Sequence, residues 1–176
     1  MPTTTTVATL IGNPRPASRT AQIAAAVAAA VARGLDDAYV VAPVELGLHG
    51  AAVLAPESAE VGRDRDAVAA ADVLVVASPT YKATYTGLLK SFFDRYDGRG
   101  LAGVTAVPLM VGASAEHALA VELHLRPVLV ELGAVVAGRG LYVLDSQLDD
   151  LDAAVTAWWT ANGPAIRAVA LSGGAA

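Results

Sequence analysis

The feature that most constrains the fold is a run of four branched apolar residues, Val73 to Val76. An uninterrupted apolar run is typical of a strand buried on both faces, because a solvated face would require alternating polar residues. Comparable apolar runs occupy Val7–Ile11 and Val104–Val111, and segments with helical spacing lie between the runs. Strands that alternate with helices predict repeated βα units and a parallel sheet covered by helices.

The same alternation continues along the rest of the chain. We predict one domain over residues 1–176, an α/β fold with a doubly wound five-stranded parallel sheet of order 2-1-3-4-5 and helices on both faces. The expected strands are Val7–Ile11, Tyr39–Val44, Asp72–Ala77, Val104–Val111 and an interrupted strand of Val135–Val136 with Leu141–Leu144. The expected helices are one that begins at Ser18, then Arg63–Ala71, Gly87–Tyr96, Ser114–Leu132 and Leu148–Ala161, the last ended by Asn162-Gly163-Pro164.

Charge and composition exclude several classes of function. The net charge is −5 and the 12 basic residues are scattered, so no basic stripe is available for a nucleic acid. The absence of cysteine excludes disulfides, thiolate metal sites, cysteine nucleophiles and iron–sulfur clusters. Uncharged stretches are shorter than the roughly 18 apolar residues of a membrane span, and the N-terminus lacks a basic signal-peptide region. We therefore expect a soluble, cytoplasmic protein.

In open parallel sheets, ligands bind beyond the carboxyl ends of the strands, where the strand order reverses. This rule selects the loops 12–20, 78–86 and 112–116. The first loop enters a helix, so free backbone N–H groups and the helix dipole point at one place. Ser18 and Thr20 add hydroxyl groups there, and Arg15 and Arg19 add positive charge, which suits a phosphate monoester. The alternative is that Ser18 only caps the helix and the arginines are solvated.

The second loop is rich in aromatic and small hydroxyl residues. Pro79 keeps the residue before it extended, and Tyr81 and Tyr85 follow. A flat aromatic ligand would find a stacking surface here, although a tyrosine loop at a subunit interface explains the same residues. Lys90 and Asp94 stand four apart on the next expected helix, a spacing that predicts a local ion pair.

The third loop, Gly112-Ala113-Ser114-Ala115, lies between a strand and a helix start and superficially resembles a nucleophile elbow. That turn requires a small residue two positions after the serine, where this chain has Glu116, so a serine hydrolase is not favoured. A ring of N–H donors that face an electron-rich ligand edge is the better interpretation. The histidines lie far apart or out of helical register, so no metal site is predicted from His49, His117 and His124.

Taken together, these loops resemble the NAD(P)H-dependent flavin mononucleotide (FMN) reductase family, of flavodoxin-like fold, from residue 7 to about 150. The matching segments are Gly12-Asn13-Pro14-Arg15 with Ser18-Arg19-Thr20, Ser78-Pro79-Thr80-Tyr81-Lys82, Gly87-Leu88-Leu89-Lys90, Gly112-Ala113-Ser114 and Leu125-Arg126-Pro127-Val128-Leu129. Tyr81-Lys82-Ala83 and the last segment look most like the reductase components of two-component alkanesulfonate monooxygenases.

The resemblance implies an enzyme that transfers a hydride from NADPH or NADH to FMN. It implies that the FMN phosphate binds at Arg15, Ser18, Arg19 and Thr20. It places the isoalloxazine ring against Pro79, Thr80, Tyr81 and Lys82, with the far edge of the ring at Gly112, Ala113 and Ser114. No catalytic acid, base or metal is expected, because the cofactor carries the chemistry.

The helix after the third loop is expected to be distorted. Pro127 lacks an N–H and clashes with the carbonyl of Leu123, so a break is expected between these residues. Members of the family that serve monooxygenases have a π-bulge here. The resemblance therefore implies a flavin-dependent monooxygenase as partner, and our hypothesis is that the distortion lies at a subunit interface. The apolar composition, Trp158-Trp159 and the tyrosines favour a homodimer or homotetramer. The departures Asn13 and Ala113, where the family usually has Ser and Gly, are expected to preserve flavin binding.

Three other functions remain open at this point. The protein could retain FMN and reduce quinones, azo dyes or metal ions with the same site. It could be a flavodoxin-type electron carrier, although such carriers are typically more acidic than a net charge of −5. It could also be a structural or partner-regulating domain. The residues do not decide between NADPH and NADH.

Overall fold

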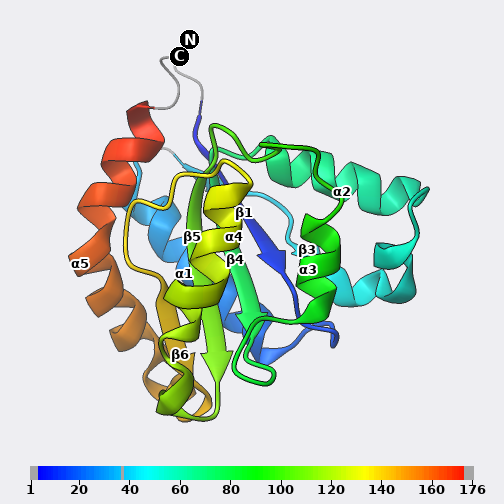
Figure 1. Cartoon of the computed structure of the whole chain (residues 1–176). Coiled ribbons are helices and arrows are strands. Elements are labelled where there is room, and N and C mark those ends of the chain that lie inside the picture. Colours follow the sequence, from blue (N-terminus) through cyan, green and yellow to red (C-terminus); the bar gives the residue numbers. More distant parts are fainter. Residues whose placement is uncertain (1–3, 37, 173–176) are drawn as a thin grey trace.

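A computed structural model describes residues 4–36 and 38–172, arranged as one twisted sheet between two helical layers (Figure 1). All strand pairs are parallel, and the strand order is β2-β1-β4-β5-β6 with β3 also paired to β1. The strands are β1 Thr6–Ile11, β2 Tyr39–Val40, β3 Val44–Glu45, β4 Val73–Pro79, β5 Thr105–Gly112 and β6 Leu141–Leu144. The predicted α/β class and the predicted strand order are confirmed.

The predicted strand Tyr39–Val44 is divided into two short pieces on the same edge. β2 pairs with the start of β1 and β3 with its end, and the N–H of Val41 still donates to the carbonyl of Val7 at 3.0 Å. Pro43 lies in the gap and has no N–H to donate to β1. The proline therefore divides one predicted strand into β2 and β3 without changing the order of the sheet.

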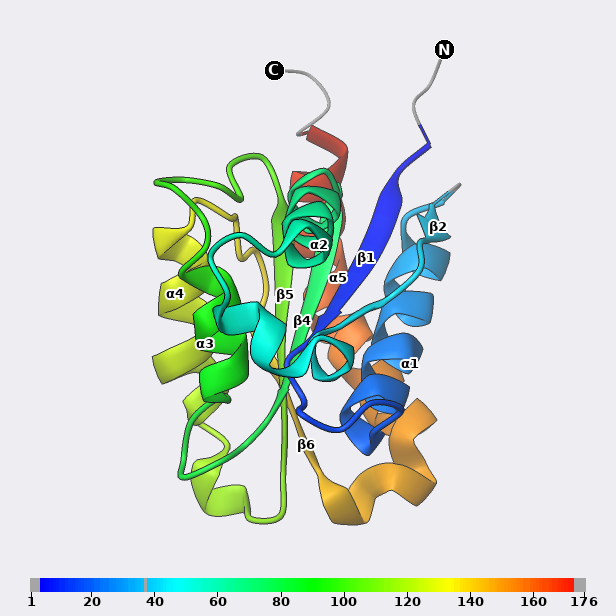
Figure 2. The same ribbon diagram turned by 90° about the vertical axis from the view of Figure 1, so that its right-hand side faces the viewer.

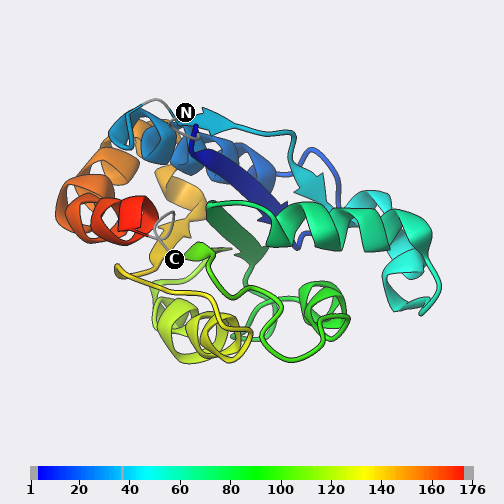
Figure 3. The same ribbon diagram turned by 90° about the horizontal axis from the view of Figure 1, so that it is seen from above.

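Helices cover both faces of the sheet, as predicted. α1 (Arg19–Gly34) and α5 (Leu151–Ser172) lie on one face, whereas α2 (Ala59–Ala69), α3 (Gly87–Phe93) and α4 (Arg126–Glu131) cover the other (Figures 2 and 3). Within β4, Val73 and Val75 pack into the core under α1 and α5, whereas Leu74 and Val76 pack into the opposite core. All four side chains are fully buried, which accounts for the apolar run.

Two predicted helix boundaries shift in the structure, and the irregular segment before α2 acquires local order. α2 begins at Ala59 rather than Arg63, because the hydroxyl of Ser58 accepts a hydrogen bond from the N–H of Val61 and caps the helix. The irregular segment before α2 contains two 3₁₀ turns, η1 (Leu46–Leu48) and η2 (Gly50–Leu54). α3 ends at Phe93 rather than Tyr96.

The prediction of one helix over Ser114–Leu132 is wrong. The segment consists of a 3₁₀ turn η3 (Ala115–His117), a π-helical segment η4 (Val121–Leu125) and α4. The N–H of Arg126 donates to the carbonyl of Val121, a wider spacing than in an α-helix. Pro127 follows at once and cannot donate to Leu123, so the expected break is confirmed as a π-helix.

The predicted end of the last helix at Asn162-Gly163-Pro164 is also wrong, because α5 continues to Ser172. Tertiary contacts hold the helix together across the proline. Ile166 is buried in the core, and the guanidinium group of Arg167 donates to the carbonyl of Gly34 at 2.8 Å and to Asp36. The side chain of Asn162 accepts from the N–H of Arg139. Burial and these polar contacts outweigh the local preference of the proline for a helix end.

The outer part of the sheet follows the prediction more closely. Val135 forms an isolated parallel bridge with Thr105, and β6 continues that edge at Leu141–Leu144, so the interrupted strand is confirmed.

The described residues include no helix that is both long enough and apolar enough to span a membrane.

Candidate functional site

A cavity of about 460 Å³ lies at the carboxyl ends of β1, β4 and β5, where the three selected loops meet. This end of the sheet is the lower end in Figure 1. The cavity is lined by Asn13, Arg15, Pro16, Ala17, Ser18, Arg19, Thr20, Pro79, Thr80, Tyr81, Val111, Gly112, Ala113 and Asp145. The structure thus gathers all the predicted site residues around one cavity except Lys82 and Ser114, which adjoin the lining residues Tyr81 and Ala113.

Asn13 organises the first loop from within. It is buried, its side-chain amide donates to the hydroxyl of Thr20 at 3.0 Å, and its side-chain oxygen accepts from the N–H of Arg15 at 2.9 Å. An Asn that bonds to the backbone two residues on is a common turn former. Ser18 caps α1 by accepting from the N–H of Ala21 at 3.3 Å, so the capping interpretation of this residue is confirmed.

Two residues that were not predicted from the sequence support the first loop: Glu45 of the neighbouring strand β3 and Gly47 of the 3₁₀ turn η1 that follows it. The carboxylate of Glu45 accepts from the N–H of Ala17 at 2.8 Å, and Ala17 has a φ of 50°, which is unfavourable for alanine. Gly47 lies so close that a Cβ atom would be 2.7 Å from the carbonyl oxygen of Asn13 and 2.8 Å from that of Pro14. No local pattern reveals these contacts, because they join segments about thirty residues apart.

The two arginines of the first loop differ in their surroundings. The guanidinium group of Arg19 lies 3.5 Å from the carboxylate of Asp145, and both side chains are partly exposed. Asp145 is the first residue of the 3₁₀ segment η5 (Asp145–Asp150), which follows β6. No carboxylate within residues 4–36 and 38–172 forms an ion pair with Arg15. Asp145 is also not among the site residues predicted from the sequence.

The second loop is a tight turn that follows the end of β4. Ser78 and Pro79 belong to β4, which corrects the prediction that the loop begins at Ser78. Tyr81 and Thr84 exchange backbone hydrogen bonds of 2.8 and 3.2 Å across Lys82 and Ala83, whose φ angles are 51° and 65°.

Buried hydroxyl groups tie the first and second loops together. Ser78 donates to the carbonyl of Pro79 at 2.9 Å and accepts from the N–H of Thr86 at 3.1 Å. Thr86 in turn donates to the carbonyl of Gly12 at 2.6 Å and caps α3 by accepting from the N–H of Leu89. These bonds lie within the buried interior, where each satisfied polar group adds rigidity.

One polar atom of the cavity wall lacks a partner. The hydroxyl oxygen of Thr80 is buried and forms no hydrogen bond with any residue in the described part of the chain. A Cβ atom placed on Gly112 would lie 3.1 Å from it, so the hydroxyl lies beside the floor of the third loop. A buried hydroxyl without a partner is unfavourable, and a bound ligand with a polar edge would satisfy it.

The third loop packs closely against β6. A Cβ atom on Gly112 would lie 2.0 Å from the phenol oxygen of Tyr142, whose hydroxyl donates to the carbonyl of Ser114 at 2.9 Å. The hydroxyl of Ser114 accepts from the N–H of Glu116 at 3.2 Å and thereby caps η3. The position therefore requires glycine, because any side chain would displace the tyrosine or the loop.

We expect Gly112→Ala to lower the free energy of unfolding by about 1–3 kcal/mol, because overpacking strains a rigid ring and the backbone around it. In a Tyr142→Phe background the same substitution should cost less than half as much, because the phenol oxygen is gone. Urea denaturation of the four proteins of this cycle measures both costs. Equal costs in the two backgrounds would show that Tyr142 is not the obstacle.

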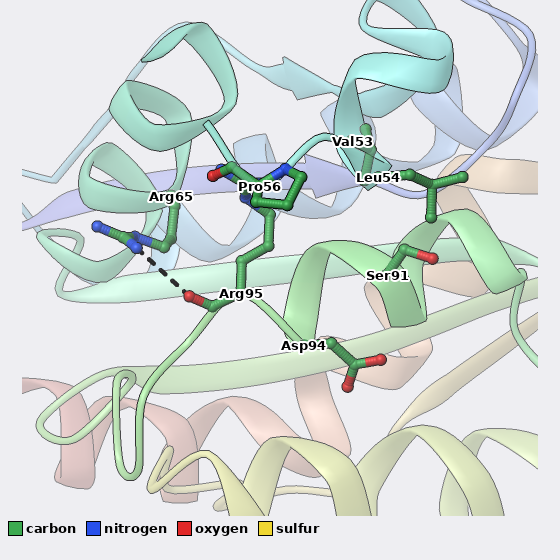
Figure 4. A pocket seen from close by; sticks show the side chains of 7 residues that line it. All are labelled: Val53, Leu54, Pro56, Arg65, Ser91, Asp94 and Arg95. Atoms are coloured by element: carbon green, nitrogen blue, oxygen red, sulfur yellow. Dashed lines mark hydrogen bonds between the residues drawn. The ribbon is translucent and has the colours of Figure 1, made fainter. Parts of the chain in front are cut away.

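A second cavity, of about 410 Å³, lies between η2, α2 and α3 (Figure 4). Its arginines are occupied in holding the chain together. Arg65 donates to the carbonyl of Arg95 at 3.3 Å, and Arg95 donates to the carbonyls of Ala55 and Pro56 at 2.6 and 3.2 Å. We interpret this cavity as structural, because its cations bind backbone carbonyls.

The predicted ion pair on α3 is confirmed. The ammonium group of Lys90 lies 2.5 Å from the carboxylate of Asp94, and this hydrogen bond raises the pKa of Lys90.

The side chain of His49 is largely buried and contacts the carboxylate of Asp64 at 2.5 Å. Over the described residues, no group of three or more His, Cys, Asp or Glu side chains could hold a metal ion.

Comparisons with known proteins point to one family. The model of the NADPH-dependent FMN reductase family matches residues 5–149. An FMN reductase (NADPH) of Pseudomonas aeruginosa is 32% identical over 142 residues, which are 79% of this chain and 76% of that protein. An FMN reductase (NADPH) of Escherichia coli is 44% identical over 80 residues, 46% of this chain and 42% of that protein. The chain spans about half the length of most of the curated relatives it matches.

Solved structures agree in fold. The apo form of the NADH:FMN oxidoreductase EmoB superposes with a TM-score of 0.80 at 32% sequence identity, and the match covers 96% of this chain and 90% of that one. The flavodoxin-like architecture implied by the sequence is therefore shared with a protein of closely similar size.

Proposed function

We propose, from the premise that this chain belongs to the family of NADPH-dependent FMN reductases, that it transfers a hydride from NADPH or NADH to FMN. The observation that carries the proposal is the cavity at the carboxyl ends of β1, β4 and β5. Part of the lining is a cationic loop at the start of a sixteen-residue helix, and another part includes Thr80, whose hydroxyl has no partner among the described residues. A phosphate at the first part and a polar ring at the second fit this lining.

The first loop would hold the FMN phosphate. Ser18 and Thr20 are hydroxyl-bearing residues at the start of α1, and Arg15 and Arg19 bring positive charge to the same wall. The helix dipole and the free N–H groups of the first turn favour an anion there. Capping of α1 by Ser18 is compatible with this role, since the hydroxyl oxygen accepts the capping bond and its hydrogen remains free to donate.

The second and third loops would hold the isoalloxazine ring. We assign the ring to Pro79, Thr80 and Tyr81, with Lys82 at the rim of the turn, and its far edge to Gly112, Ala113 and Ser114. The hydroxyl of Thr80 supplies a donor or acceptor for the polar edge, and glycine at position 112 keeps that edge free of side chains.

FMN supplies the redox chemistry when it is bound, so the protein needs no catalytic acid, base or metal of its own. The residues of the chain would bind FMN, orient it and shield it from water. The backbone N–H groups of the third loop would stabilise the negative charge that a bound flavin develops during reduction. The buried bond from Thr86 to the carbonyl of Gly12 joins the first and second loops, and the bond between Ser78 and Thr86 orders the second; fixed loops would preserve the stacking geometry that hydride transfer requires.

The test is a steady-state assay of NADPH and NADH oxidation with FMN, FAD and riboflavin as acceptors. We expect turnover with FMN and a protein that is purified nearly colourless, because a flavin that serves as substrate is released. A protein that retains yellow FMN and reduces quinones or azo dyes would favour the alternative activity. No oxidation of either nucleotide with any flavin would overturn the proposal.

We expect Arg15→Gln to weaken FMN binding by about tenfold, since a charge-assisted hydrogen bond contributes roughly 1.5–3 kcal/mol. Riboflavin lacks the phosphate, so its affinity should not change. Arg33→Gln, in the last turn of the same helix, is the matched control and should bind FMN like the wild type. Flavin fluorescence titrations measure all these affinities, and an equal loss for FMN and riboflavin would contradict a phosphate role for Arg15.

The partner in this proposal is a flavin-dependent monooxygenase that uses the reduced FMN, and the protein itself is a homodimer or homotetramer. The π-helical segment η4 supports both statements, because π-segments are found mostly at functional sites. Leu119, Leu123 and Val130, in or beside η4 and α4, have exposed fractions of 58%, 64% and 54%. Exposed leucines and valines so close together favour contact with another subunit.

A further inference from the structure

An acidic residue lines the wall of a cavity that is otherwise suited to an anion. Asp145 contributes to the same cavity as the first loop, and its carboxylate lies 3.5 Å from the guanidinium group of Arg19. About one third of the Asp145 side chain and 60% of the Arg19 side chain are exposed. The pair is therefore in contact with solvent and can exchange partners.

The position of Asp145 is determined by the fold. It follows β6 directly, and the side chain of Gln147 accepts a hydrogen bond from the N–H of Leu144 at 2.9 Å, which orders the start of η5. β6 itself pairs with β5, the strand that leads into the third loop. The carboxylate is thus held beside the phosphate loop by the edge of the sheet.

Two further contacts of the first loop hold its backbone. Asn13 accepts from the N–H of Arg15, and Glu45 accepts from the N–H of Ala17. These bonds shape the loop. The contact between Arg19 and Asp145 instead joins two charged side chains that both line the cavity. The guanidinium group that would bind a phosphate is therefore already paired with the carboxylate of Asp145.

We propose that Asp145 sets the affinity for FMN by competing with the flavin phosphate for Arg19. This inference rests on the proposed function. Binding of the phosphate requires Arg19 to exchange one anion for another, and the displaced carboxylate then remains near the phosphate and repels it. Both effects weaken binding and accelerate release. For a reductase that passes reduced flavin to a second enzyme, rapid release of the flavin is part of the function.

The decisive experiment compares Asp145→Asn with the wild type for three ligands: FMN, riboflavin and inorganic phosphate. We expect FMN and phosphate to bind about three- to tenfold more tightly to the variant, a change typical of removing one nearby like charge in partly solvated surroundings. Riboflavin affinity should be unchanged. Stopped-flow measurement should show a slower dissociation of FMN, and KM for FMN should fall more than kcat changes.

The chain offers a matched control. Asp150→Asn removes the same charge from the same 3₁₀ segment, but Asp150 is exposed and does not line the cavity. It should leave all three affinities at the wild-type values. An equal gain in Asp150→Asn would mean that net charge alone is responsible, and that result would overturn the inference.

A double-mutant cycle tests whether the effect acts through Arg19. In an Arg19→Gln background, Asp145→Asn should give less than half of its original gain in FMN affinity, since the competition for the guanidinium group is gone. An undiminished gain would contradict the competition.

The opposite outcome is also informative. If Asp145 accepts hydrogen bonds from the sugar-alcohol chain that FMN and riboflavin share, Asp145→Asn will weaken both flavins, and the inference fails while the proposed function stands. If the wild-type protein binds no FMN at all, both the inference and the proposed function fail. The experiment therefore separates the two.

Discussion

Gly47→Ala is expected to weaken FMN binding by about tenfold or more, with a much smaller effect on riboflavin. A Cβ atom at this position would lie 2.7 Å from the carbonyl oxygen of Asn13, and 2.8 and 2.9 Å from the carbonyl oxygen and carbon of Pro14. All three are backbone atoms, so no side-chain rotation can relieve the contact. The first loop itself must move, and a displaced loop no longer aims its N–H groups and arginines at one phosphate.

The matched control for this prediction is Gly62→Ala. Gly62 lies in α2, and a Cβ atom there meets nothing within 4 Å. Alanine is the better helix former, so this control should bind flavins normally and gain up to about 1 kcal/mol of stability. Fluorescence titrations with FMN and riboflavin measure the contrast. If Gly47→Ala binds FMN as tightly as the control, η1 does not position the first loop for FMN.

Phe92→Ala is expected to lower the free energy of unfolding by about 3–5 kcal/mol, a typical loss for a large aromatic side chain removed from a core. Phe92 belongs to α3, and its side chain is fully buried in the core beneath this helix. Its ring contacts that of Phe93 at a centroid distance of 6.4 Å and that of Tyr96 edge-on at 5.9 Å. The space left by the ring cannot close easily, because the sheet and the two remaining rings hold its walls in place.

Urea denaturation measures this loss. Leu171→Ala, near the end of α5 with an exposed fraction of 49%, is the control and should change stability by less than about 0.5 kcal/mol. A loss below 1 kcal/mol for Phe92→Ala would mean that the α3 layer relaxes around the cavity and contributes little to folding.

Burial within the same cluster also raises the pKa of Tyr96, whose hydroxyl donates to the carbonyl of Arg65.

Patterns within short segments predicted most of the architecture. The apolar run Val73–Val76 requires a strand with a core on each side, and the structure places alternate residues in opposite cores. The break near Pro127 was predictable because a proline lacks the N–H that a helix needs. The missing N–H does not by itself predict that the break takes the form of a π-helix. The end of the last helix predicted at Pro164 was wrong, because the local effect of the proline does not decide the structure at this position. There, long-range contacts of Ile166 and Arg167 outweigh the local preference.

The sequence by itself determined the class of fold, the order of the strands and the three loops that meet at the cavity. Apolar periodicity and helix starts are local properties, and the rule that places sites at a reversal of strand order needs only topology. The tertiary structure alone decided which distant residues contact the first loop. Glu45 of β3, Gly47 of η1 and Asp145 of η5 approach it from distant parts of the chain, and the contacts depend on how these segments are folded together. The residues next to a side chain in the sequence do not indicate its partner on a distant segment. For this reason the contact between Asp145 and Arg19 could be found only in the folded chain.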